Sequence, residues 1–368
     1  MALHEAVLQI PIVDNHAHPV QELSADEITE SFPTYFVEGD LPPEQARHAL
    51  HYRAALSLLR ERFNVETEAE LLEARTAVDL QSYSREIIGE TNTEVILADD
   101  GYPETTLAEF KSYTDAELQP VRRIEPIIEA LLSEYDGFAA FEAAFEQRIE
   151  QALSNSVSLK SIIAYRTGLD ITQPDSAAAS EAFADVKEEF DGRIADSTLH
   201  EYLLHRATDL AGAAGKPVQL HTGLGDIDAH PRYVDPTYLY EYLRVHQKTP
   251  IVLLHGGYPY VRSAGYMTST FPNAYLDVSL AVPFVQHGVA PLLRHALELT
   301  PTTKLLYGSD AFILPEIYLL AARQIRTDLA TVLQSLVNEE YLTADYAETT
   351  ARRILRKNAV NLYDLSIK

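Results

Sequence analysis

The sequence predicts an α/β protein built on a (β/α)8 TIM barrel. Three observations lead to this prediction: short apolar runs recur along the chain, a helical pattern follows each run, and eight such units are present. Strands that alternate with helices pair in parallel, and eight such units favour a closed barrel. Two halves of a doubly wound sheet are the alternative, although no glycine-rich phosphate loop follows any run.

The eight predicted strands are rich in β-branched and aliphatic residues, and each ends in a polar residue or glycine. In chain order they span residues 10–18, 93–101, 121–127, 158–166, 217–223, 251–257, 274–280 and 304–310. A final helix at 350–365 is expected to pack against the barrel.

Residues 22–92, between the first and second strands, are predicted to be a helical insertion in a single barrel domain spanning 1–368. Apolar residues repeat with helical periodicity at 46–63 and 68–90. Most barrel connections are much shorter than this segment. Because it leaves the C-terminal end of the first strand, we expect either a lid over the barrel mouth or packing against the barrel side or a second subunit.

The composition is strongly acidic, with 55 Asp and Glu against 29 Lys and Arg and a net charge of −26. This charge argues against nucleic acid or an anionic membrane as a partner, because their phosphates would be repelled. An acidic, lysine-poor surface is typical of a halophilic protein, since high salt screens the self-repulsion. An acidic mesophilic protein is the alternative interpretation.

Cysteine is absent, which excludes disulfides, thiolate metal ligands and a cysteine nucleophile. The N-terminal residues lack the basic start and long apolar core of a signal peptide. No stretch approaches the roughly 20 apolar residues that span a bilayer. We therefore expect a soluble, cytoplasmic protein.

Polar residues stand at the ends of the predicted strands, where barrel enzymes carry their chemistry. His16 and His18 are two positions apart at the end of the first strand, so both side chains face one side. The remaining candidates at this level are Lys160, Arg166, His221, His255 and Asp310. Histidine and aspartate are suitable ligands for Zn²⁺, Mn²⁺ or Fe²⁺.

Each candidate also has a purely structural interpretation. The two histidines of HAH could be a chance pair, and His221 could be a hydrogen-bonded core residue. His255 precedes two glycines and could shape a loop, while Asp310 could cap the following helix. Their joint occurrence after strands one, five, six and eight favours a metal site.

These residues and their flanking motifs resemble the amidohydrolase superfamily of metal-dependent barrel enzymes. LKSIIAYRTGL, LHTGLGD, IVLLHGGYPY, AYLDVSL and LLYGSDAF look like the amidohydrolase-2 branch. They are most similar to the amidohydrolase part of FluG-type and nodulin–glutamine-synthetase fusion proteins.

The resemblance implies that His16, His18, His221 and Asp310 ligate a divalent metal, most simply Zn²⁺. It implies that His255 binds a second metal or polarises the substrate carbonyl. Lys160 is either a carbamylated bridge between two ions or an ordinary lysine, so one and two ions both stay open.

The corresponding mechanism uses metal-activated water near neutral pH, with Asp310 as general base and then acid. His255 would stabilise the oxyanion, and Arg166 would bind a substrate carboxylate or be a surface arginine. Tyr258 is a further candidate for the substrate pocket.

The predicted function is hydrolysis of a C–N amide bond in a small amino-acid-like substrate. The FluG-type resemblance implies a γ-glutamyl amide. Metal-dependent decarboxylation of an aromatic or unsaturated carboxylate is the alternative, and a non-catalytic scaffold is a third possibility that the complete ligand set disfavours. A homodimer is expected, because symmetric dimers are common.

Overall fold

The computed structural model describes residues 3–367, which form two compact units. The first unit contains the residues up to Leu118 together with Val278–Arg294 and Tyr307–Lys357. The second contains Gln119–Asp277, His295–Leu306 and the residues from Asn358 onward.

Eight strands form one sheet in the order β1 to β8, which confirms the predicted (β/α)8 barrel fold. The strands are β1 (Ile12–Ala17), β2 (Thr93–Asp99), β3 (Glu117–Arg123), β4 (Ser158–Ser161), β5 (Val218–Leu220), β6 (Ile251–Leu253), β7 (Ala274–Asp277) and β8 (Leu305–Leu306). The pairs β1–β2 and β3–β4 through β7–β8 are parallel. Parallel strands in sequential order are the arrangement that repeated β–α units produce.

The helices follow the strands along the chain. They are α1 (Leu3–Leu8), α2 (Pro43–Ala46), α3 (Leu50–Phe63), α4 (Glu68–Thr76), α5 (Leu80–Glu90), α6 (Leu107–Phe110), α7 (Ile124–Glu134), α8 (Phe138–Ser154), α9 (Ser176–Glu189), α10 (Ser197–Ala213), α11 (Tyr240–Val245), α12 (Val261–Thr270), α13 (Ala281–Val285), α14 (Val289–Leu299), α15 (Pro315–Asn338), α16 (Ala344–Arg352) and α17 (Asn358–Leu362). In residues 3–367, no helix is both long enough and apolar enough to cross a membrane.

Most strands end earlier in the structure than predicted, for example β4 at Ser161, β5 at Leu220 and β8 at Leu306, and two further differences have a local cause. The third strand begins at Glu117 and ends at Arg123, whereas the sequence placed it at 121–127. Residues from Ile124 onward form α7, because apolar side chains three and four positions apart give that segment one buried face. The helical stretch at 68–90 is two helices, since Asp79 accepts a hydrogen bond from the Ser82 N–H and caps α5.

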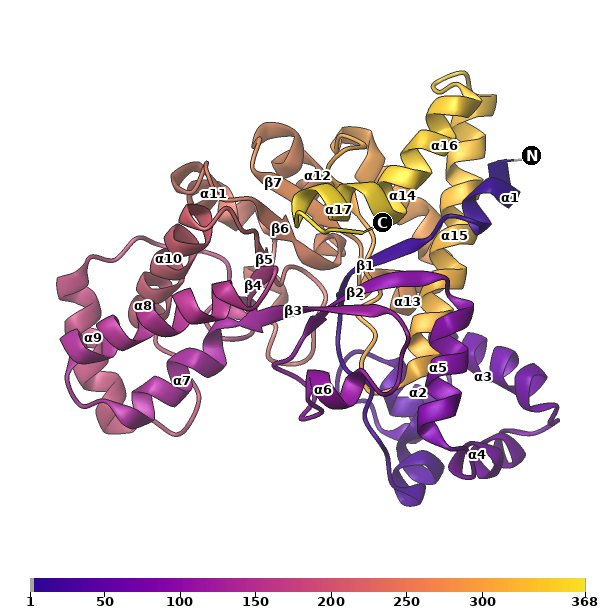
Figure 1. The fold of residues 1–368 in the computed structure, drawn as a ribbon, viewed down its shortest axis with the longest axis horizontal. Helices are drawn as coiled ribbons and strands as arrows, with labels where there is room; N and C mark the ends of the chain where they lie inside the picture. The colour runs from indigo at the N-terminus through magenta and orange to yellow at the C-terminus, as the bar shows by residue number, and fades with distance from the viewer. Residues whose placement is uncertain (1–2, 368) are drawn as a thin grey trace. The chain divides into compact units, whose positions relative to one another are not determined.

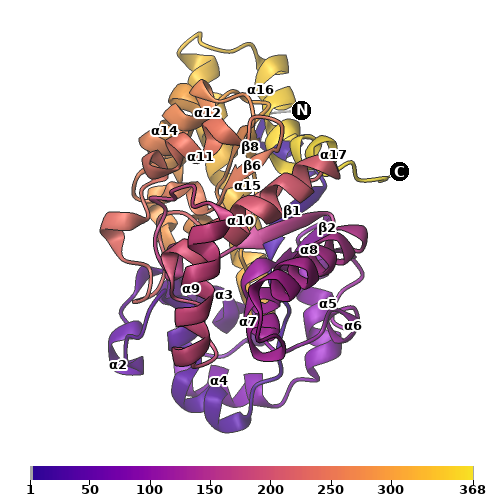
Figure 2. The ribbon, with the colours of Figure 1, turned by 90° about the vertical axis from the view of Figure 1, so that its left-hand side faces the viewer.

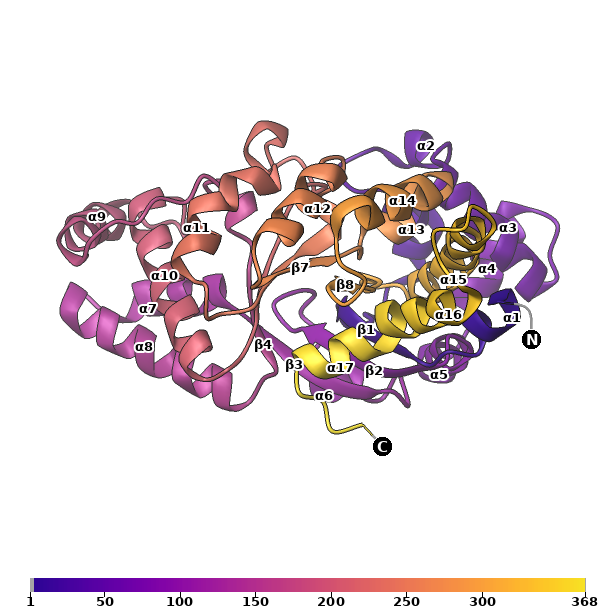
Figure 3. The same cartoon turned by 90° about the horizontal axis from the view of Figure 1, so that it is seen from above.

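In the first unit, α3, α4 and α5 lie within the segment that connects β1 to β2, and α5 packs along α15 (Figure 1). Helices α1, α15 and α16 lie side by side (Figure 3). Buried Arg75 on α4 bonds through Nε to Glu316 on α15 at 2.5 Å. These contacts attach the helices of the connection to the rest of the unit.

The carboxyl end of β1 is joined to the chain that follows β8. The Asn15 N–H donates to the Tyr307 carbonyl at 3.0 Å, and the Asp310 N–H donates to the His16 carbonyl at 2.8 Å. A parallel bridge between Val20 and Ile313 continues the pairing. This pairing holds two predicted functional segments in register.

In the second unit, α8 packs against α7 and α10, and α10 packs against α9 (Figure 2). At the end of β4, Glu125 Oε1 accepts hydrogen bonds from the Ser161 hydroxyl at 2.6 Å and the Ile162 N–H at 2.9 Å. His200 Nε2 lies 3.1 Å from the same oxygen. These contacts fix the end of β4 to α7 and α10.

Candidate metal centre

Strand β1 places two histidines close together at its carboxyl end. All six residues of the strand are buried, and His18 follows its last residue. His16 is fully buried and His18 is 8% exposed. Residues two apart on extended backbone share a face, so the two imidazoles point the same way.

Asp310 reaches the same place from the segment after β8. Its backbone has φ of 49°, in the left-handed region that non-glycine residues rarely adopt. The His18 N–H donates to the Ala311 carbonyl at 2.7 Å on one side of it. On the other side, the Asp14 carboxylate accepts the Ser309 N–H at 2.8 Å. Backbone pairing therefore sets the position of the Asp310 side chain against β1.

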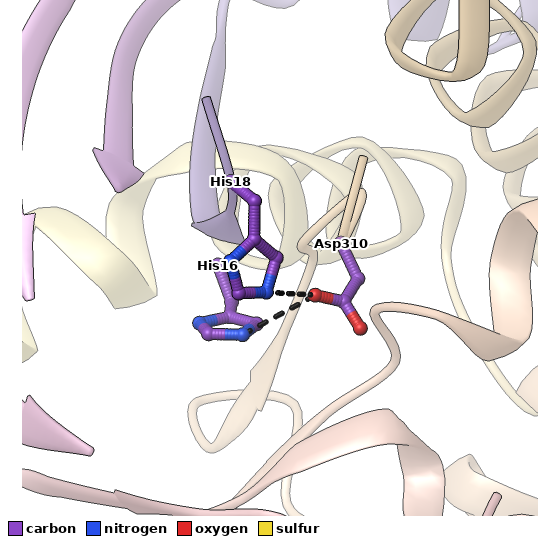
Figure 4. A group of neighbouring side chains, drawn as sticks. All are labelled: His16, His18 and Asp310. Atoms are coloured by element: carbon purple, nitrogen blue, oxygen red, sulfur yellow. Dashed lines mark ion pairs between the residues drawn. The ribbon is translucent and has the colours of Figure 1, made fainter. Parts of the chain in front are cut away.

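The three side chains converge through single atoms. One carboxylate oxygen of Asp310 lies 3.2 Å from His16 Nε2 and 3.1 Å from His18 Nε2. Figure 4 shows both rings turned toward this oxygen, while the other carboxylate oxygen points away from them. Within residues 3–367, these three residues are the group of histidine and carboxylate side chains with ligand atoms close enough for one ion, all within 4.8 Å of one another.

The tautomer of His18 is set by its neighbour. His18 Nδ1 lies 2.9 Å from the Tyr102 backbone carbonyl, which can only accept a hydrogen bond. The Nδ1 atom therefore carries the proton, and Nε2 presents a lone pair toward Asp310. Orientation of a ligating imidazole through its second nitrogen is typical of metal sites.

A buried tyrosine also binds the backbone of the same histidine. The Tyr318 hydroxyl donates to the His18 carbonyl at 2.5 Å. Burial, with the negative charges of Asp14 and Asp310, raises the pKa of Tyr318 well above its ordinary value, so it remains a donor. Two imidazole nitrogens and one carboxylate oxygen, all buried, fit a divalent transition metal.

His221 and His255 lie against each other in the second unit. His221 follows β5 and His255 follows β6, and His221 Nδ1 lies 2.9 Å from His255 Nε2. The Tyr165 ring packs on His221 with ring centroids 4.3 Å apart. The His255 N–H donates to the Asp277 carboxylate at 3.3 Å. Both histidines are buried.

The loops that carry these two histidines are packed backbone to backbone. Gly223 has φ of 71°, and a side chain there would come within 2.3 Å of the Tyr258 carbonyl oxygen. His255 itself has φ of 67°. Only glycine fits at 223, so the HTG and HGGYP segments hold each other at a fixed distance.

The other predicted site residues also lie in the second unit. Lys160 is buried in β4, beside Arg123 and Gln219 in the strand register. Arg166 is half-buried and forms an ion pair with Glu129 at 3.6 Å. Tyr258 donates its backbone N–H to the His255 carbonyl at 3.1 Å. The roles predicted for these residues, and for His221 and His255 as ligand and polarising group, stay predictions.

Sequence reasoning missed the residues that orient the candidates. Four such residues form hydrogen bonds with a candidate residue or with its neighbour in the chain: Asp14, Tyr102, Tyr318 and Asp277. Asp277 ends β7 in AYLDVSL, so the rule that strand ends carry function could have found it. Tyr102 acts through its carbonyl, which leaves no signal in residue type.

Comparison with known proteins shows the family to which the chain belongs. The amidohydrolase family model Amidohydro_2 matches residues 167–365. Protein fluG of Emericella nidulans is 28% identical over 99% of this chain, and the chain spans 47% of the length of that protein.

Solved structures show the same fold. A crystal structure from Lactobacillus casei ATCC 334 is described as a metal-dependent hydrolase and is 29% identical to this chain, with a TM-score of 0.90. The match covers 99% of this chain and 97% of the Lactobacillus casei chain. Uronate isomerase from Thermotoga maritima has a TM-score of 0.71 and 14% identity, with 98% and 96% covered, and shares the fold.

Fold and site together define a barrel protein with a histidine–histidine–aspartate cluster at the carboxyl end of its first strand. The chain belongs to the amidohydrolase family. It is thus an enzyme of a family that generally uses a divalent metal.

Proposed function

We propose that this chain is a divalent-metal-dependent hydrolase that cleaves the amide bond of a small amino-acid-like substrate. The observation that carries the proposal is the convergence of His16, His18 and Asp310 on one point with the tautomer of His18 set for ligation. The description of the Lactobacillus casei protein as a metal-dependent hydrolase, at 29% identity, supports the reaction class.

The chain's own residues would hold the ion and handle the proton. His16 and His18 would bind it through Nε2, and Asp310 through the oxygen that faces them. A bound divalent cation supplies Lewis acidity and lowers the pKa of water toward neutrality. The second oxygen of Asp310 is then available to accept a proton from water and return it to the departing nitrogen.

Zn²⁺ is the proposed ion, because two imidazoles and a carboxylate are ligands it commonly takes. A γ-glutamyl amide is the proposed substrate, from the likeness to protein fluG. We propose that the protein binds a small-molecule substrate and that it assembles as a homodimer.

The test is metal analysis of the purified protein together with release of amine from a panel of γ-glutamyl amides. Metal that is retained, and an amide that is cleaved only by metal-loaded protein, would support the proposal. Release of carbon dioxide from a carboxylate substrate, with no amide cleaved, would instead identify a decarboxylase.

A further inference from the structure

A row of aromatic rings extends from the metal-ligand cluster within the first unit. The Tyr102 ring stands edge-on to His18 with centroids 6.1 Å apart, and Phe312 lies 6.3 Å from Tyr102. Phe284 is stacked parallel to Phe312 at 6.3 Å. His51 meets Phe284 edge-on at 4.6 Å. We call Tyr102, Phe312 and Phe284 the aromatic row.

The row is assembled from segments that follow three different strands. Tyr102 comes after β2, Phe284 lies on α13 after β7, and Phe312 comes two residues after Asp310. Tyr102 is 46% exposed, and the other two rings are partly exposed. Loops at the carboxyl ends of strands are where barrel enzymes bind substrate. Ring surface beside candidate metal ligands is therefore available for contact with a small molecule.

The segments that carry the row contain carboxylates but no lysine or arginine. Lysine and arginine are absent from residues 3–46, 86–110, 278–293 and 307–322, which include the metal ligands and all three rings. The same segments hold many acidic residues, including Asp99, Asp100 and Glu104 around Tyr102. A substrate carboxylate would find no lysine or arginine on these segments, whereas an ammonium group would find ring faces and negative charge.

Two neighbouring groups are consistent with this electrostatic character. Burial raises the pKa of Tyr35, and the negative charge of Glu27 raises it further, so this ring stays neutral at pH 7 and lies within the field of a carboxylate. His51, where the row ends, donates Nδ1–H to the Phe36 carbonyl at 3.0 Å. Burial lowers the pKa of His51 to about 4, so its ring is neutral at pH 7 and adds no positive charge.

We infer that the aromatic row binds the amine portion of the substrate and selects one that carries a second, positively charged amino group. The inference rests on the proposed function and names the leaving group of that reaction. The scissile amide would lie at the metal ligands, and the ammonium group would lie against Phe312 and Phe284. Rings attract a cation through their negative faces, and a neutral alkyl chain of equal length gains only apolar contact there.

Direct binding tests the inference without turnover. Calorimetry at fixed low salt would compare an aliphatic diamine with the monoamine of the same carbon number. We expect the wild-type protein to bind the diamine about tenfold more tightly, the ratio that cation–ring contacts of about 1.4 kcal/mol produce. Phe312→Leu and Phe284→Leu should each remove most of that preference. Equal affinities in the wild type would overturn the inference.

Matched variants separate ring chemistry from folding. Phe312→Tyr keeps the ring face and should retain the preference for the diamine. Phe138→Leu changes a partly buried phenylalanine in the second unit, which contacts Phe141 and Phe183, and should leave the preference unchanged. Circular dichroism would show that each variant is folded. Loss of the preference in Phe138→Leu as well as in Phe312→Leu would count against a role specific to the row.

Kinetics distinguish failure of the inference from failure of the proposed function. If γ-glutamyl amides are cleaved, Phe312→Leu should raise KM about tenfold for an aminoalkyl amide and much less for the alkyl amide of equal length. Equal effects on both would overturn the inference and leave the function standing. Selective diamine binding without any amide cleavage would overturn the function and leave the inference standing.

Discussion

His18 Nε2 lies 3.1 Å from a carboxylate oxygen of Asp310, although one residue follows the first strand and the other follows the last. The same oxygen is 3.2 Å from His16 Nε2. Three buried polar side chains that meet at one atom form an electrostatic unit. Loss of any one of these side chains therefore changes the environment of the other two.

Removal of one imidazole should remove the metal. His18→Ala is expected to lower bound Zn²⁺ to background and to abolish hydrolysis, because two of three candidate ligands hold an ion much more weakly. Elemental analysis after dialysis measures the first effect and an amine-release assay the second. His48→Ala, at an exposed position on the connecting segment, is the control and should retain both. A His18→Ala protein with full metal content would contradict the assignment.

Asp310→Asn should separate proton transfer from folding. The amide keeps the size of the carboxylate and one oxygen, but it cannot accept a proton. We expect kcat to fall by about a hundred- to ten-thousand-fold, the range typical of a lost general base. Steady-state kinetics at saturating metal measure this. Retention of more than a tenth of the wild-type kcat would exclude Asp310 as the proton acceptor.

The number of ions per chain should be one. The three-residue cluster is sufficient to position a single ion, and Lys160 is proposed as an ordinary buried lysine. Lys160→Met should then leave the metal-to-protein ratio unchanged. Elemental analysis of protein prepared at several carbon dioxide concentrations measures this metal-to-protein ratio. A ratio of two that falls in this variant would instead establish a carbamylated bridge.

Arg75 and Glu316 should contribute strongly to the stability of the first unit. Both side chains are buried, and Tyr83 donates its hydroxyl to the same Glu316 oxygen at 3.1 Å. Arg75→Met leaves a buried carboxylate without its cation, which costs about 3–5 kcal/mol in the free energy of unfolding. Urea denaturation measures this, and Arg75→Met combined with Glu316→Leu should recover much of it.

A control for this prediction is the exposed pair Arg244–Glu241. Arg244→Met should change the free energy of unfolding by less than about 1 kcal/mol, since water already screens that pair. If Arg75→Met were equally mild, the buried pair would not be what holds α4 to α15.

His51 should make stability depend on pH. Its pKa in the folded protein is about 4, below its ordinary value of 6.5, so the unfolded chain takes up the proton first. The contribution is therefore complete above pH 6.5 and is lost as the pH falls toward 4. It amounts to about 3 kcal/mol at full extent. His51→Asn, which can keep the bond to the Phe36 carbonyl, should flatten the dependence.

Urea denaturation of the wild type and of His51→Asn at pH 7 and pH 4.5 measures how the free energy of unfolding of each protein depends on pH. The difference between the two proteins is the informative quantity, because the many carboxylates titrate in both. Parallel pH profiles would show that His51 is protonated in the fold at no cost.

Much of the fold follows from local pattern. Runs such as IPIVDNHAH and PVQLHTG are short, apolar and bounded by polar residues, so their identity as strands and their order could be predicted. The residues at which these strands end could not be predicted in this way. Ile124 satisfies a strand pattern as well as a helix pattern, and packing of α7 decided between them. The break at Asp79 likewise depends on one capping hydrogen bond.

The sequence by itself determined that His16 and His18 lie at the end of the first strand and that Asp310 follows the last one, because residue type and apolar context can be read from the chain alone. Tertiary structure alone decided that they meet at one atom, that Tyr102 sets the tautomer of His18, and that Tyr318 holds its carbonyl. These relations join segments far apart in the chain. They arise when β1 forms hydrogen bonds with the segment after β8. A local sequence pattern does not specify the distance between residues so far apart in the chain.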